Sequence, residues 1–110
     1  MKKIERLGEF EQLVLWTLVR LRDDAYGMAI RRELEERASR HVSIGAVYAT
    51  LGRLEEKGLV SSRRGDPIPE RGGKARRYFK IEARGATALQ EARKVLSKAW
   101  RGLSPAEVKG

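Results

Sequence analysis

The chain has 110 residues, of which 41% are hydrophobic, and it carries no cysteine and a formal net charge of +9. This length predicts one compact domain, and the missing cysteines exclude a disulfide framework and a zinc site built from thiolates. Residues 13–19 form the longest apolar run, which is too short to cross a bilayer, and the charged first residues lack the apolar core of a signal peptide. We therefore expect a soluble cytoplasmic protein that has no membrane partner.

The positive charge lies almost entirely in the second half of the chain. Residues 1–55 hold 10 basic and 9 acidic side chains, whereas residues 56–110 hold 14 basic and 6 acidic ones. A local excess of this kind favours a polyanionic partner, with nucleic acid first and an anionic membrane second.

The first predicted helix spans residues 7–21, where an apolar stripe recurs at helical spacing. Four further apolar side chains lie off this stripe, at Leu13, Leu15, Trp16 and Val19. The helix is thus apolar around much of its circumference, and we expect it to have a second buried face. A second helix is predicted over residues 25–37, with Asp24 as its N-cap and one half-buried face.

A third helix is predicted in the segment "SIGAVYATLGRLEEKGLV", with Ser43 as its N-cap and Gly58 as its C-terminal stop. Its inward stripe consists of Val47, Leu51 and Leu54, and its opposite face carries the small residues Gly45, Ala49 and Gly52. A glycine costs a helix about 1 kcal/mol relative to alanine, so these glycines call for a reason.

The second half of the chain predicts a hairpin and one long helix. Residues 59–64 and 75–81 have the pattern of strands, joined by an exposed loop of prolines and glycines at 65–74. The helix is predicted over residues 83–102, and spacings of three and four give it a coiled-coil seam of about two heptads. We expect the tail, residues 104–110, to be frayed.

This order of elements is that of a winged helix-turn-helix, in a mainly α fold with a small β-hairpin. We assign residues 1–82 to a winged-helix DNA-binding domain and residues 83–110 to a C-terminal dimerisation helix and tail. The third helix would enter the DNA major groove, which is about 12 Å wide and admits a helix whose leading face is small. A stripe of small residues also suits close packing by another protein helix, which is the competing interpretation.

Four segments of the chain carry a family resemblance: "LGEFEQLVLWTL", "DDAYGMAIRRELEER", "SIGAVYATLGRLEEKGLV" and "ERGGKARRYFKIEARGATAL". Throughout residues 7–89 they resemble the PadR family of bacterial transcriptional regulators, in the compact branch that has a single C-terminal helix. The resemblance implies a homodimer joined through that helix and repression that a small molecule relieves.

The predicted DNA-contacting residues come from the third helix and the hairpin. They are Ser43, Gly45, Tyr48, Ala49, Gly52, Arg53, Arg63, Arg64, Arg71, Lys74, Arg76 and Arg77. Tyr48 lies beside the inward stripe and suits a core aromatic residue, but the resemblance implies a contact with the DNA backbone. Asp66 and Glu70 are the only nearby acids, too few to neutralise six hairpin cations, so phosphate binding is favoured over a merely solvated loop.

A second set of residues is predicted to form a dimer interface or a ligand site. It comprises Leu13, Trp16, Leu89, Ala92, Leu96, Ala99, Trp100 and Leu103. In the family, members that bind drugs hold planar ligands between aromatic residues at the dimer centre, which implies a small aromatic effector near Trp16 and Trp100. The simpler alternative is that both tryptophans fill the dimer interface.

Catalysis finds little support, since His41 is the only histidine and no phosphate-cradling glycine motif is present. We expect no enzymatic activity, no cofactor and no metal. The predicted function is sequence-specific DNA binding at a pseudo-palindromic operator by a homodimeric repressor. Two alternatives remain open: a non-specific nucleic-acid-binding protein, suggested by "RGGKARR", and a winged-helix module that binds only proteins.

Overall fold

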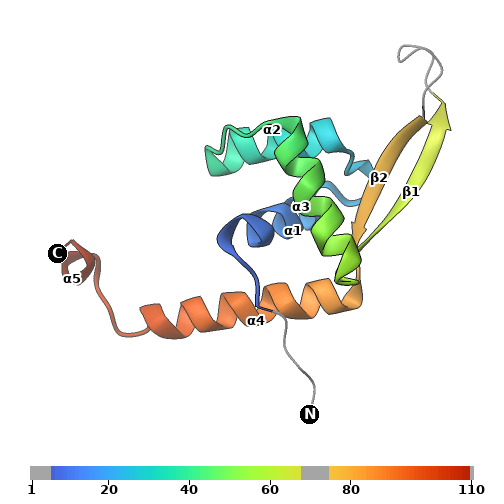
Figure 1. Cartoon of the computed structure of the whole chain (residues 1–110). Helices are drawn as coiled ribbons and strands as arrows, with labels where there is room; N and C mark the ends of the chain where they lie inside the picture. The colour runs from blue at the N-terminus through green and yellow to red at the C-terminus, as the bar shows by residue number, and fades with distance from the viewer. Residues whose placement is uncertain (1–5, 68–74, 110) are drawn as a thin grey trace.

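The computed structural model describes residues 6–67 and 75–109 and shows a bundle of helices with one β-hairpin (Figure 1). The elements follow one another as α1 (Glu9–Leu21), η1 (Arg22–Asp24), α2 (Gly27–Ala38), α3 (Ile44–Glu56), β1 (Val60–Pro67), β2 (Ala75–Ile81), α4 (Ala83–Trp100) and α5 (Pro105–Val108). The predicted winged helix-turn-helix followed by a C-terminal helix is confirmed.

Helix α1 lies at the centre of the fold and contacts α2, α3, β2 and α4. It begins two residues later than predicted, and the Gly8 N–H donates to the Glu11 carboxylate at 2.9 Å in the manner of a capping box. Leu15 is fully buried although it lies off the predicted stripe. The expected second buried face is thus real, because a central helix is covered on several sides.

The connection between α1 and α2 differs from the prediction. Asp24 is not an N-cap: it ends the 3₁₀ turn η1, and α2 begins at Gly27 after Tyr26, which makes no side-chain cap bond. Residues 25 and 26 are not helical and Tyr26 is extended, because the Ala25 carbonyl accepts a hydrogen bond from the Phe79 N–H at 2.8 Å. Pairing with β2 therefore displaces the start of the helix.

Helix α3 follows its sequence pattern closely. The Ala46 N–H donates to Ser43 Oγ at 3.1 Å, as an N-cap requires. Val47, Leu51 and Leu54 are fully buried in the core. Gly58 adopts φ +75°, a left-handed conformation that glycine tolerates best and that ends the helical region as predicted.

The two strands form an antiparallel hairpin that extends beyond the helices (Figure 1). β1 begins one residue later and ends three residues later than predicted, and the pairing has a bulge between Arg64 and Pro67. Tyr26 forms an isolated β-bridge with Tyr78 on the other edge of β2, which ties the segment before α2 to the wing. Val60 and Phe79 anchor its base in the core.

Helix α4 packs closely on the wing at its start and leaves the core at its end. A Cβ at Gly85 would overlap the Leu59 carbonyl oxygen, so only glycine allows this approach. Glu82 occupies the N-cap position without capping, since its carboxylate accepts from Ser61 Oγ at 2.6 Å. The helix ends two residues before the predicted position, Gly102.

The tail is not frayed as predicted, because Ser104 and Glu107 form a capping box for the four-residue helix α5. The radius of gyration is 16.1 Å, against about 13 Å for a compact domain of this length. The projecting half of α4 makes the chain this extended (Figure 1). None of the helices in the described residues is long and apolar enough to span a membrane.

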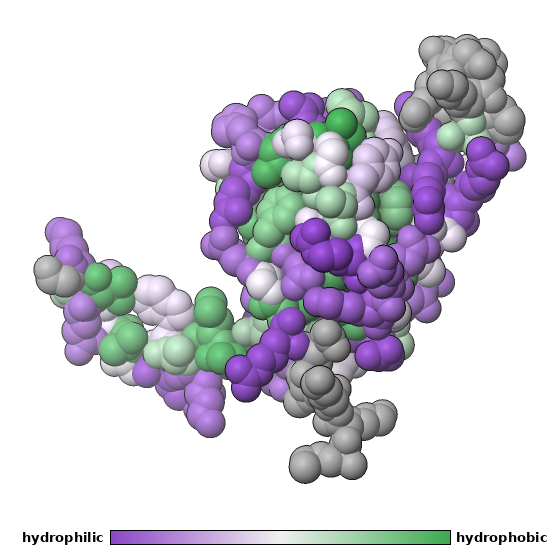
Figure 2. Space-filling view, viewed as in Figure 1, coloured by the Kyte–Doolittle hydropathy of each residue, from purple (hydrophilic) through white to green (hydrophobic). Residues whose placement is uncertain are grey.

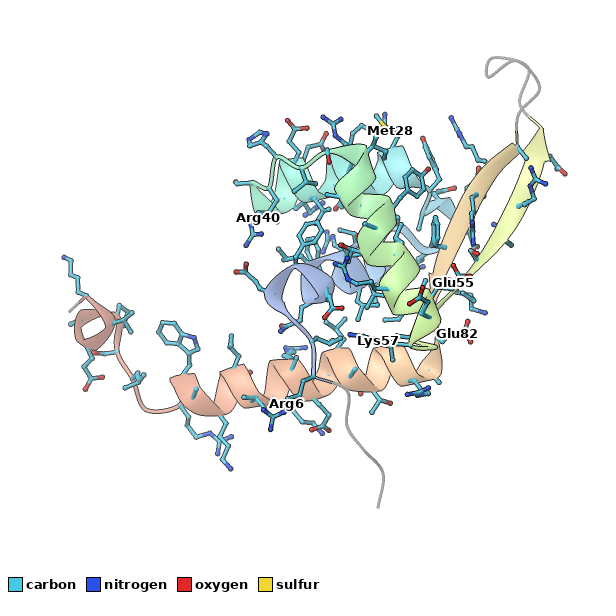
Figure 3. All side chains as sticks on the ribbon, in the orientation of Figure 1. Arg6, Met28, Arg40, Glu55, Lys57 and Glu82 are labelled. Atoms are coloured by element: carbon cyan, nitrogen blue, oxygen red, sulfur yellow. The ribbon has the colours of Figure 1, made fainter. Side chains whose placement is uncertain are left out.

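One ion pair ties the C-terminal end of α3 to the first turn of α1. Lys57 Nζ donates to Glu11 Oε2 at 3.2 Å, and Figure 3 shows Lys57 just beyond the end of α3. Burial raises the pKa of Glu11, but the Gly8 N–H and Lys57 more than offset it, so the pKa lies below its usual value. The carboxylate thus helps to hold α3 in its orientation.

Candidate nucleic-acid interface

The outer face of α3 is open to solvent. Gly45, Ala49, Gly52 and Arg53 are all exposed there, and the N-cap Ser43 is exposed at the start of the helix. The buried stripe lies on the opposite face, so the small residues contact none of the core. The structure brings these predicted positions together on one surface.

Neither of the two α3 glycines is required by the rest of the chain. A Cβ at Gly52 would meet no atom within 4 Å, and one at Gly45 would meet only Ser43 Oγ at 3.9 Å. Gly52 lies in the helix interior, where glycine is about 1 kcal/mol less favourable than alanine. Packing among the described residues therefore gives no reason for this glycine.

Tyr48 is partly packed within the fold and partly exposed, so it fits both roles that the sequence allowed, a core aromatic residue and a contact with DNA. Its ring packs on Gly27 at the start of α2, where a Cβ would overlap the phenol, and lies 6.2 Å from the Phe79 ring. Yet 44% of the residue remains exposed beside the small face. The contact with Gly27 fixes the ring and leaves part of it available to a ligand.

Arg53 extends the outer face of α3 with a positive charge. Its Nη2 donates to Thr50 Oγ1, three residues earlier, at 3.1 Å. This single bond leaves most of the five guanidinium donors available for another partner. Arg53 is thus placed as predicted, exposed on the same helix as Gly52.

The hairpin carries cations that the chain does not neutralise. Among residues 6–67 and 75–109, no carboxylate pairs with Arg63, Arg64 or Arg76. Arg64 stands directly opposite Arg77 in the strand register, and like charges in that position are unfavourable. Figure 2 shows the hairpin as a largely hydrophilic arm. Arg71 and Lys74 lie outside the described residues.

Arg77 differs from the other hairpin arginines because it is paired within the chain. Its Nη2 lies 3.1 Å from Glu55 Oε1 and 2.8 Å from Ser62 Oγ, and Ser62 Oγ donates to Glu55 Oε2 at 2.8 Å. Figure 3 shows Glu55 at the end of α3 beside the base of the hairpin. This cluster joins α3 to the wing.

The residues predicted to form a dimer interface or a ligand site fall into a half-buried group and an exposed group. Leu13 and Leu89 are half-buried against the chain's own core, and Trp16 and Ala92 are also half-buried. The remaining positions, Leu96, Ala99, Trp100 and Leu103, are exposed, as is Val95, which was not predicted. Figure 2 shows apolar side chains along the projecting half of α4. The structure thus separates an intrachain group from a bare apolar face.

Several residues that shape this surface were not predicted. Glu55 and Ser62 fix Arg77, Gly27 seats Tyr48, and Tyr26 packs against the hairpin. For Tyr26 and Gly27 the sequence offers one signal: "AYG" at the start of α2 does not fit a plain helix start. Their contacts join segments distant in the sequence, so spacing alone does not reveal them.

Comparisons with known proteins agree with this architecture. The family described as "Transcriptional regulator PadR-like family" matches residues 14–91. A PadR-like transcription factor from Bacteroides fragilis is 26% identical with a TM-score of 0.71, and 82% of each chain is covered. A PadR family transcriptional regulator from Eggerthella lenta is 27% identical with a TM-score of 0.66, over 86% of this chain and 81% of that one.

A structure titled as a complex of hsRosR-S1 is 29% identical to this chain, with a TM-score of 0.67 over 86% of this chain and 78% of that one. RosR itself comes from H. salinarum. No curated protein matches this chain at a significant level. Because the family match spans most of the winged helix and the start of α4, the chain belongs to the PadR-like family of transcriptional regulators.

Proposed function

We propose that the protein is a sequence-specific DNA-binding repressor and that α3 is the helix that enters the major groove. The observation that carries this proposal is the outer face of α3, where Gly45, Ala49 and Gly52 are exposed. Such a face lets the helix approach base edges closely, and Arg53 beside it can donate two hydrogen bonds to a guanine. Ser43 and Tyr48 lie at the margin of this face, where they would contact the DNA backbone.

The hairpin would bind the phosphate backbone beside the groove. Arg63, Arg64 and Arg76 have no carboxylate partner in the described chain, and phosphate oxygens are the natural acceptors for guanidinium groups. Arg77 would act mainly by holding the wing on α3 through Glu55. Arg71 and Lys74 remain proposed phosphate contacts.

The repressor would act as a homodimer joined through the projecting half of α4. On α4, Val95 is 67% exposed, Leu96 55% and Trp100 52%, and Leu103 just beyond the helix is 51% exposed, which is unusual for neighbouring large apolar side chains. A second copy of the chain would cover them, with Ala92 and Ala99 allowing close approach. Two-fold symmetry then requires a pseudo-palindromic operator with half-sites about 10 bp apart or a multiple of that spacing.

A small aromatic effector would bind near the dimer seam and relieve repression, as the family resemblance implies. Trp100 offers an exposed ring, and Trp16 is half-buried with the Arg20 guanidinium 5.1 Å from its ring centroid. Such a ligand lowers DNA affinity only if it binds more tightly to a dimer whose α3 helices no longer fit both half-sites. Saturable quenching of tryptophan emission by planar aromatic compounds, lost in Trp100→Ala, would support this site.

The decisive experiment is selection of bound duplexes from a random pool, followed by salt titration on the selected and a scrambled duplex. We expect a dyad-symmetric sequence bound at least about 10³-fold more tightly than the scrambled one. Equal binding of both duplexes would identify a non-specific nucleic-acid-binding protein. No binding to any duplex would favour a module that recognises only proteins.

A further inference from the structure

Two adjacent tyrosines, Tyr26 before α2 and Tyr78 on β2, lie between two hairpin arginines on one face of the wing. The Arg76 guanidinium carbon lies 4.1 Å from the centroid of Tyr26, the Tyr26 and Tyr78 rings meet edge to face at 5.8 Å, and the Arg63 guanidinium carbon lies 4.6 Å from the centroid of Tyr78. Both distances to the cations are within the range of cation–π attraction. We call these four residues the Arg–Tyr stack.

Strand pairing brings the stack together. Tyr26 bridges to Tyr78, and Arg63 stands opposite Tyr78 in the hairpin register, so the three side chains emerge on one face. Arg76 lies two residues before Tyr78 on the same strand and therefore shares that face. The β-bridge before α2 is thus what supplies the second ring.

The two rings are held firmly from outside the stack. Arg32 Nη2, on α2, donates to the Tyr26 hydroxyl at 2.9 Å. At the bulge, a Cβ on Gly65 would overlap the Tyr78 ring, so the glycine makes room for it. The tyrosines therefore form a fixed support against which the two arginine side chains rest.

The arginines of the stack retain hydrogen-bonding capacity that the described chain does not use. No carboxylate there pairs with either of them. Arg76 Nε is buried without a hydrogen-bond partner among the described residues, so donation to a phosphate would come from the terminal nitrogens of its guanidinium. Stacking on a ring leaves the guanidinium edge available for donation. Arg77, by contrast, donates hydrogen bonds to Glu55 and Ser62.

We propose that Tyr26 and Tyr78 are positioning residues, which hold Arg76 and Arg63 in place to donate to phosphate oxygens of the DNA backbone. A free arginine loses rotamer freedom when it binds, and an arginine already held against a ring loses less. The inference rests on the proposed function, because it assumes that the wing lies on DNA. It adds that DNA affinity depends on uncharged rings as well as on charges.

The test measures operator affinity as a function of salt for the full-length protein and its variants, with urea unfolding in parallel. Tyr26→Leu should weaken binding about three- to tenfold while leaving the salt slope unchanged, since Arg76 keeps its charge. Arg76→Ala should weaken binding and reduce the slope by about one. In the double variant Tyr26→Leu should add almost nothing, because the residue that it positions is gone.

Two further variants separate the ring from the hydroxyl and the charge. Tyr26→Phe keeps the ring and should bind within about twofold of the parent. Arg76→Lys keeps the charge but loses the planar stacking group, so it should weaken binding about three- to tenfold at an unchanged slope. Arg64→Lys is the matched control, an arginine outside the stack, and should change affinity less. If Tyr26→Leu fails to fold, the comparison of the two lysine variants carries the test.

Failure of the inference can be told apart from failure of the proposed function. A folded Tyr26→Leu protein that binds like the parent, or additive effects of Tyr26→Leu and Arg76→Ala, would overturn the positioning role. An equal loss for Arg76→Lys and Arg64→Lys would do the same. If the parent protein itself prefers no duplex, the proposed function fails before the stack is tested.

Discussion

Two helices of this protein present open surfaces of opposite kinds. The outer face of α3 is small, with Gly45, Ala49 and Gly52, whereas the projecting half of α4 exposes large apolar side chains such as Leu96 and Trp100. Burying large apolar area stabilises an association by about 25 cal/mol per Å² and suits a protein partner. A small face adds little of that free energy but allows a rigid partner to come close to the backbone.

The difference agrees with the two partners proposed above, DNA at α3 and a second copy of the chain at α4, and with two kinds of interaction free energy. Removing apolar area from α4 should break the dimer without affecting the core, which α4 leaves after its first turns. Adding volume to α3 should break the specific DNA complex without affecting the dimer. The following experiments test this separation.

The largest effect is expected for Trp100→Ala. Truncating a tryptophan in a packed interface costs about 3–5 kcal/mol, so the dimer should dissociate to monomers at micromolar concentration. The monomer should keep its fold, because Trp100 contacts none of the core. Light scattering gives the mass and circular dichroism the helix content. Lys98→Ala, on the same exposed turn, is the control that should stay dimeric. A dimeric Trp100→Ala protein would place the interface elsewhere.

Ala49→Leu should weaken the specific complex by about 1–3 kcal/mol, the usual effect of disrupting one base-pair contact, and leave non-specific binding almost unchanged. The added side chain holds α3 away from the bases, whereas phosphate contacts on the hairpin persist. Titration of operator and scrambled duplexes measures both affinities. Ala83→Leu adds the same volume at an exposed position of α4 and should not alter either. If folded Ala49→Leu binds the operator as tightly as the parent, α3 does not lie in the groove.

Gly52→Ala should have opposite effects on folding and on DNA binding. Its Cβ meets open space, so the free energy of unfolding should rise by up to about 1 kcal/mol while operator affinity falls. Gly85→Ala is the contrasting variant and should destabilise the fold by about 1–3 kcal/mol, because its Cβ overlaps the Leu59 carbonyl. Urea denaturation and duplex titration measure the two quantities. A destabilised Gly52→Ala protein would show that this glycine serves the fold.

The smallest effect concerns Glu11, which steadies α3 but not α4. Its pKa is lowered in the folded state, so the carboxylate stabilises the fold above its usual pKa, and this stabilisation is lost as the pH falls through the folded value. Glu11→Gln should therefore be less stable than the parent at about pH 7 and should approach it at about pH 3. Urea midpoints at both pH values check this. A constant difference would exclude titration of Glu11 as the cause.

The parts of this fold that sequence predicts best are those where local chemistry and packing agree. On α3, the Ser43 cap and the stripe of Val47, Leu51 and Leu54 satisfy both requirements at once. The prediction that Asp24 caps the second helix was wrong. The hydrogen bond between Ala25 and β2, a tertiary contact, outweighed the local preference of aspartate for an N-cap. The tail residues Ser104 and Glu107 cap a helical turn that the overall polarity of the segment concealed.

The candidate site was predictable in its composition but not in its connections. The small face of α3 and the arginines of the hairpin are visible in the sequence because each lies within one element. The pairing of Arg77 with Glu55 and the contact between Tyr26 and Tyr78 join separate elements, and only the register of the hairpin brings them together. The sequence therefore could not show which of the hairpin arginines lack a carboxylate partner. The structure shows this for the residues that it describes.

At Gly85, α4 lies close to Leu59, the residue before β1, and this contact couples the orientation of the long helix to that of the wing. Its 18 residues extend about 27 Å, and the contact with Leu59 and the bond from Ser61 to Glu82 clamp its first turn to the wing. If a partner holds the far end of α4, a rotation of about 5° about that end would move the first turn, and the wing attached to it, by roughly 2 Å. Such a displacement exceeds the range of about 0.5 Å in N–H···O hydrogen-bond distances, so a small rotation far from the hairpin would break contacts that the hairpin makes with a rigid partner.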